Sequence, residues 1–129
     1  MQIEFTLPIK AYSINNYMYT TRRVITKEAR LWSDMVKEHL RAIPCLAEFK
    51  SKYNYTPINI QINVYYPKNV FYNKEGLISS KTFDISNTEK ILIDLIFKDT
   101  LDINDKYITY MESSKHAGEA YMISFRIET

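Results

Sequence analysis

The chain has 129 residues, a formal net charge of +2 and one cysteine; 46% of its residues are hydrophobic and 25% are charged. This length suits one domain with a hydrophobic core, and the composition excludes a disordered chain. No apolar run approaches the roughly 20 residues that a membrane helix requires, and residues 1–10 lack the apolar core of a secretory signal. We therefore expect a single domain over residues 1–129, located in the cytoplasm.

The first half of the chain predicts a strand, a helix and a second strand. In IEFTL, residues 3–7, apolar side chains alternate with polar ones until Pro8, which is typical of a half-buried strand. Thr26 is a suitable N-cap, and apolar residues follow it at helical spacing until Pro44, which predicts the first long helix. The stretch PINIQINVYY, residues 57–66, alternates most regularly, so one face of this strand must meet a core.

The second half predicts a helix and two more strands. A long loop over residues 67–83 leads to a second helix at 88–98, whose apolar residues form a buried stripe. Two final strands lie near 106–112 and 119–128, separated by SSKHAG, in which Gly118 suits a turn. The order β-α-β-α-β-β predicts an α/β (α+β) fold, a mixed β-sheet of about four strands with two helices packed on it.

Charge is distributed unevenly along the chain. Residues 84–105 hold six acidic residues and two lysines, whereas residues 20–60 and the loop at 67–83 are mainly basic. A site that handles phosphodiesters with a divalent cation needs carboxylates for the metal and Lys or Arg for the backbone. Scattered solvated charge gives a similar pattern, and the distribution alone favours that simpler interpretation.

The start of the second helix allows two interpretations. Ser86 and Glu89 have the spacing of a capping box, in which the two residues close a helix start reciprocally. Asn87, Lys90 and Asp94 lie at positions i, i+3 and i+7, and so share one helix face that begins at Asp84. The pattern is therefore either an ordinary capped helix or half of a metal site.

The stretch DISNTEKILID resembles the motif Asp-x-Asp-Asn-x-x-Lys of the RusA-type Holliday junction resolvases, which continues into a helix carrying another aspartate. The acidic pair that follows in this family falls on Asn104 and Asp105. LPIKAYSINNYMY and VITKEARLW are similar to the N-terminal segments of the family, so the resemblance spans nearly the whole chain. It implies a Mg²⁺-dependent endonuclease, with Mn²⁺ as a possible substitute, that acts as a homodimer and resolves four-way DNA junctions by paired nicks in recombination and repair.

The resemblance also implies roles for individual residues. Asp84 and Asp105 match metal ligands and Lys90 matches the functional lysine, so these three are the expected catalytic residues. Ser86 occupies the third position of the metal site, where the family has an aspartate. The supporting residues implied are Asn87 and Asp94.

Replacing a carboxylate by the Ser86 hydroxyl removes a full charge from the ligands of the metal. Two hypotheses follow, an active resolvase and a junction-binding protein with weakened or lost cleavage. In both, we expect contacts to DNA from Asn16, Arg22, Arg23, Lys68, Lys74 and Lys81.

Overall fold

The computed structural model describes residues 1–13 and 25–129. Its strands are β1 (Gln2–Leu7), β2 (Ile58–Pro67), β3 (Ile108–Gly118) and β4 (Met122–Glu128). Its helices are α2 (Lys27–Arg41), α3 (Pro44–Lys52), the single turn α4 (Lys68–Phe71) and α5 (Ile85–Ile93). A π-helix, η1 (Asp94–Leu101), continues α5, and a 3₁₀ turn, η2 (Asp105–Tyr107), leads into β3.

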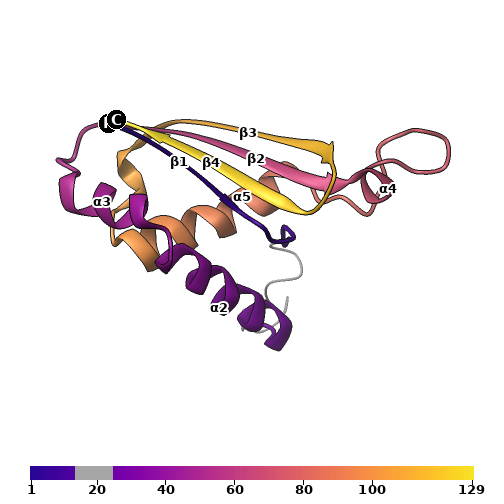
Figure 1. Ribbon diagram of the computed structural model, residues 1–129, viewed down its shortest axis with the longest axis horizontal. Coiled ribbons are helices and arrows are strands. Elements are labelled where there is room, and N and C mark those ends of the chain that lie inside the picture. Colours follow the sequence, from indigo (N-terminus) through magenta and orange to yellow (C-terminus); the bar gives the residue numbers. More distant parts are fainter. Residues whose placement is uncertain (14–24) are drawn as a thin grey trace.

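The four strands form one mixed sheet in the order β1-β4-β2-β3. β4 is antiparallel to both β1 and β2, whereas β2 and β3 run parallel. Figure 1 shows α2, α3 and α5 together on one face of this sheet. The predicted α+β fold with a mixed four-stranded sheet is confirmed.

The alternating residues of β2 place the core between the sheet and the helices. Ile60, Ile62 and Val64 are buried, and the fully buried Leu92 and Leu95 come from α5 and η1. Each such side chain contributes about 1.5–3 kcal/mol when it leaves water. The polar residues between them on β2 lie on the other face, as the alternation predicts.

Thr26 caps α2 as predicted, since its Oγ1 accepts a hydrogen bond from the Ala29 N–H at 3.1 Å. The first helix ends before Pro44 as predicted, at Arg41, but the helix that follows it was not predicted. Pro44 is the first residue of a further helix, α3, because a proline at that position needs no backbone donor and already has helical φ. The observed order is therefore β-α-α-β-α-β-β, apart from the single turn α4.

The prediction of a turn at SSKHAG, residues 113–118, is also wrong. These residues belong to β3 and continue its parallel ladder with β2, from Ser113 beside Ile62 to Gly118 beside Pro67. Their polar side chains find partners across the strands; the Ser114 hydroxyl donates to Asn63 Oδ1 at 2.7 Å. The chain turns only after Gly118, before β4.

Candidate active site

Asp84 lies at the point where the long loop becomes α5. It is the N-cap residue, with extended backbone (φ −61°, ψ 140°), and its side chain is exposed and makes no capping hydrogen bond. An N-cap carboxylate that is not used for capping stays available to a ligand, and its negative charge is favoured at a helix N-terminus.

The predicted capping box of Ser86 and Glu89 is wrong, because the helix starts at Ile85, one residue before Ser86. Glu89 instead accepts a hydrogen bond from the Ser113 hydroxyl on β3, at 2.5 Å. This bond fixes the second turn of α5 to the sheet. The side chain of Ser86 is exposed beside Asp84 and serves no cap.

The backbone just before Asp84 is held by two side chains from neighbouring strands. The Phe83 N–H donates to the hydroxyl of Tyr66 on β2 at 3.2 Å. Lys115 Nζ on β3 donates to the Phe83 carbonyl at 3.3 Å and to Thr82 Oγ1 at 3.1 Å. Both polar groups of Phe83 are thus satisfied by long-range partners, which fixes the direction in which the chain enters α5.

Tyr66 is almost completely buried, and this burial raises the pKa of its phenol above the ordinary value of 10.0. The bond from the Phe83 N–H acts in the opposite sense and lowers that pKa. Burial is the larger effect, so the hydroxyl stays protonated at neutral pH and serves as a neutral acceptor for Phe83.

Sequence reasoning missed Tyr66, Ser113 and Lys115. Lys115 pairs with the buried Val64 and so points to the helix-covered face of the sheet. A lysine on that face requires a polar partner, and this signal was hidden because the residues around it were assigned to a turn.

Asn87, Lys90 and Asp94 form the expected stripe along the helix. Lys90 is exposed, and within residues 1–13 and 25–129 it makes no ion pair. Asn87 and Asp94 are half-buried, and Asp94 is the point where α5 becomes η1. The stripe runs from Asp84 towards the far end of the helix.

Asp105 lies at that far end, in the wall of a hollow of about 420 Å³. The hollow is lined by Ile93, Asp94, Phe97, Lys98, Asp102, Ile103, Asn104 and Asp105. Asn104, which the resemblance aligns with the first residue of an acidic pair, uses its side-chain oxygen to accept from the Lys106 N–H at 2.9 Å, capping η2. The structure thus brings Asp94 and Asp105 together at the C-terminal end of α5, where η1 begins.

Asp84 and Asp105 do not meet within one chain. Asp84 follows Phe83, which contacts Lys115 near the end of β3, whereas Asp105 precedes Ile108 at the start of that strand. Seven strand residues span roughly 23 Å, and α5 alone separates Asp84 from Asp94 by about 15 Å. Since carboxylate oxygens lie within about 2.1 Å of a bound Mg²⁺, one ion cannot bind both aspartates of one copy.

Across the described part of the chain, no group of three or more His, Cys, Asp or Glu residues is arranged to hold a metal ion. Of the expected DNA contacts, Lys68 at the start of α4 and Lys74 and Lys81 in the segment between α4 and Asp84 are exposed. Asn16, Arg22 and Arg23 lie outside the described residues. No helix of the described residues is long and apolar enough to cross a bilayer.

The sequence places the chain among DNA-cleaving hydrolases, since it matches the family described as Endodeoxyribonuclease RusA over residues 8–128. This match covers nearly the whole chain, so the chain belongs to the RusA endodeoxyribonuclease family. It is a Holliday junction resolvase endonuclease of a family whose nucleases are typically metal-dependent and whose substrate is a DNA junction. No curated protein matches the chain.

Proposed function

We propose that the chain resolves four-way DNA junctions by paired nicks, as a homodimer in which each active site takes carboxylates from both copies. The observation that carries this proposal is the separation of Asp84 from Asp105. Both are exposed, they lie at opposite ends of one helix, and the stripe of Asn87, Lys90 and Asp94 joins them.

A two-fold dimer would bring Asp84 of one copy close to Asp105 of the other. In an isologous interface, residue i of one copy meets residue j of the other, and j meets i. Two α5 helices packed antiparallel about an axis near the middle of the stripe would bring Asp84 of each copy to the hollow around Asp105 of the other. Such a dimer has two identical sites, which is the number that paired nicks require.

The donor set suits Mg²⁺ or Mn²⁺, because both prefer carboxylate oxygens and water. In this arrangement Asp84 of one copy and Asp105 of the other would hold the ion, with the Ser86 hydroxyl beside Asp84 as a weak third donor. When bound, the ion would polarise the scissile phosphate and acidify the attacking water. Lys90, exposed and without an acidic partner in the described residues, would offset the negative charge that develops on the phosphate.

Lys68, Lys74 and Lys81 are proposed to contact the DNA backbone near Asp84. All three are exposed; Lys68 begins α4, and Lys74 and Lys81 lie in the segment between α4 and α5. Lys68 lies 3.9 Å from Glu119, but both side chains are so exposed that this pair adds little and leaves the lysine available to phosphate.

A second candidate function is junction binding with weakened or lost cleavage. Two observations favour it: Ser86 and Asn104 stand where the family has carboxylates, and Asn104 is engaged in capping η2. Loss of two negative charges lowers the affinity for a divalent cation.

The experiment uses a labelled four-way junction and a linear duplex of the same sequence, with Mg²⁺ or Mn²⁺. We expect tighter binding of the junction, binding that weakens steeply with salt, symmetric nicks in two opposing strands, and a dimer mass by light scattering. Equal affinity for both DNAs, or a monomer mass at micromolar concentration, contradicts the proposal. Junction binding without nicks in either metal supports the second candidate.

A further inference from the structure

The loop after α4 contains an ordered projection, residues 72–79, which we call the finger. Figure 1 shows it extending beyond α4, past the end of the sheet. Tyr72 and Ile78 form an antiparallel bridge, the Asn73 N–H donates to the Leu77 carbonyl at 2.8 Å, and the Ser79 N–H donates to the Phe71 carbonyl at 2.7 Å. The finger is therefore a short hairpin rather than an irregular loop.

One side chain and one glycine fix the tip of the finger. Asn73 Oδ1 accepts from the N–H groups of Glu75 and Leu77, both at 3.0 Å. Gly76 has φ +78°, in the left-handed region where glycine is favoured. This local bonding means that the tip is already shaped before any partner binds, so little ordering entropy opposes binding.

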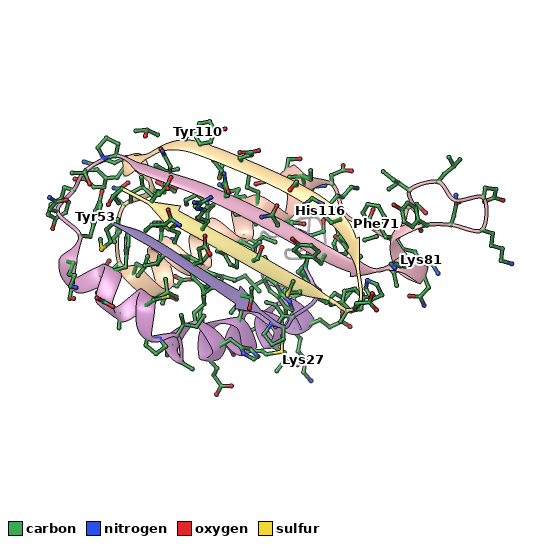
Figure 2. All side chains as sticks on the ribbon, turned by 45° about the horizontal axis from the view of Figure 1, so that its top comes forward. Lys27, Tyr53, Phe71, Lys81, Tyr110 and His116 are labelled. Carbon is green, nitrogen blue, oxygen red and sulfur yellow. The ribbon has the colours of Figure 1, made fainter. Side chains whose placement is uncertain are left out.

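The finger exposes a large apolar edge. Leu77 is 66% exposed, Ile78 58% and Tyr72 45%. The base of the finger is firmly packed, because Phe71 is buried in the core and the centroid of its ring lies 4.9 Å from that of Tyr72. Figure 2 places Phe71 and Lys81 at the same end of the molecule. A rigid support thus presents bulky apolar side chains to solvent.

The surrounding charges indicate which partner this edge fits. Residues 68–83 carry three lysines, Lys68, Lys74 and Lys81, and only one acidic residue, Glu75. Lysine is depleted in the centres of protein interfaces, whereas it is a common contact to phosphate. Apolar side chains such as Leu and Ile inserted between base steps, with basic residues beside them, are a known way of unstacking bases and kinking DNA.

The finger is also linked mechanically to Asp84. Its return arm passes through Thr82, whose N–H and hydroxyl both bond to the Ser79 carbonyl, at 3.2 and 3.0 Å. Phe83 follows, held by Tyr66 and Lys115. The position of the finger is therefore set relative to the exposed carboxylate of Asp84.

We propose that the finger is a wedge that inserts Leu77 and Ile78 between bases at the branch point of a DNA junction and unstacks them, while Lys74 and Lys81 contact the neighbouring phosphates. This inference rests on the proposed function, since it takes a junction as the ligand. At a branch point the strands exchange partners, so the stack is less continuous than in a duplex and a wedge needs to break fewer stacking contacts there.

The test is a four-way junction with 2-aminopurine at the branch point, whose fluorescence rises when the base unstacks. At saturating protein, we expect a rise with the wild type and less than about a third of it with the double variant Leu77→Ser/Ile78→Ser, because the apolar wedge is lost. The matched control is Leu31→Ser, which alters a leucine of similar exposure, 62%, on α2. It should keep the full rise.

The outcomes separate this inference from the proposed function. If the wild type binds and nicks the junction but the double variant keeps the full fluorescence rise, the wedge is wrong and the resolvase proposal stands. If the wild type does not prefer the junction to duplex, both fail. If the double variant, folded by circular dichroism, changes from dimer to monomer in light scattering, the finger contacts protein and the wedge is again wrong.

Discussion

The Asp84 end of the helix formed by α5 and η1 is held by side chains of the sheet, whereas the Asp105 end is shaped by unusual backbone geometry. At the first end, Tyr66 and Lys115 bond the backbone of Phe83, and Ser113 bonds Glu89. At the second end the helix widens into a π-helix that closes at Asp102, whose φ is +53°.

The only other non-glycine residue with positive φ in the described ranges, 1–13 and 25–129, is Tyr55, at +66°. The centroid of its ring lies 5.6 Å from that of Tyr107, two residues after Asp105. Left-handed residues of this kind cost about 1–3 kcal/mol each and tend to collect at functional sites, as do π-helical turns. The end that presents Asp84 is therefore held rigidly by side chains of the sheet, whereas the end that presents Asp105 carries backbone strain. This difference suits a site whose two halves come from different copies of the chain.

The largest expected effect comes from Asp84→Asn, which removes the carboxylate from the rigid end. The rate of cleavage of a four-way junction should fall by more than about 100-fold. Mutation of residues that only support the ligands of a metal already costs up to about 100-fold in activity, and Asp84 is proposed to be a ligand itself. Junction binding in a gel-shift assay should be retained or strengthened, because repulsion of phosphate is reduced. Loss of binding together with cleavage would mean that Asp84 is needed for folding or DNA contact instead.

Lys115→Met tests the support behind Asp84. Losing the bonds to Phe83 and Thr82 should let the start of α5 shift, and cleavage should fall by about 10-fold to 100-fold at saturating junction and metal. The effect should appear in kcat more than in KM, and Lys115→Arg should recover part of it. The control is Lys27→Met, at the exposed start of α2, which should leave the rate unchanged; an equal loss in both variants would point to general electrostatics.

Ser86→Asp adds a negative charge beside Asp84, at the end of α5 that is held by side chains of the sheet. Metal affinity and any cleavage rate should rise by roughly 10-fold, because affinity depends on the number of charged ligands. Stability should change little, and in the favourable direction by about 0.3–1 kcal/mol, since an acidic residue in the first turn of a helix suits its dipole. A folded variant that binds junctions but gains neither metal affinity nor activity would remove Ser86 from the site.

Tyr66→Phe has the smallest expected effect and concerns stability. It leaves the Phe83 N–H without its acceptor, so the free energy of unfolding in urea should fall by about 1–3 kcal/mol. Burial raises the pKa of Tyr66 above 10.0 in the folded protein, so the unfolded chain loses this proton first as pH rises. The contribution is therefore complete below pH 10 and declines above it. The difference in the free energy of unfolding between the wild type and Tyr66→Phe should therefore shrink as pH rises above 10. A difference that grows above pH 10 would contradict a raised pKa of Tyr66 in the folded protein.

Short-range signals predicted much of this fold. The Thr26 cap, the alternation of β2 and the position of Asp84 at a helix start are all set by residues close in sequence. The helix α3 was not predicted, because Pro44 was interpreted only as the end of the first helix, whereas a proline can also be the first residue of the next one.

The supports of the site could not be predicted in the same way. The bond between Lys115 and Phe83 joins residues 32 apart, and it depends on a strand register that only the folded sheet defines. The finger could have been found in part, because Asn73 and Gly76 are residues typical of a tight turn. The separation of Asp84 from Asp105 follows from the direction of β3, which no local pattern encodes.

The most direct test of a shared active site is complementation between two inactive variants. Asp84→Asn and Asp105→Asn are purified separately, then mixed, unfolded and refolded together so that heterodimers form. In a site shared between copies, each heterodimer keeps one intact pair, Asp84 from one chain and Asp105 from the other, so single-strand nicking of the junction should return. In a site formed within one chain, every site of the heterodimer lacks one aspartate. Refolded mixtures that contain heterodimers but give no nicking above the separate variants would contradict the shared site.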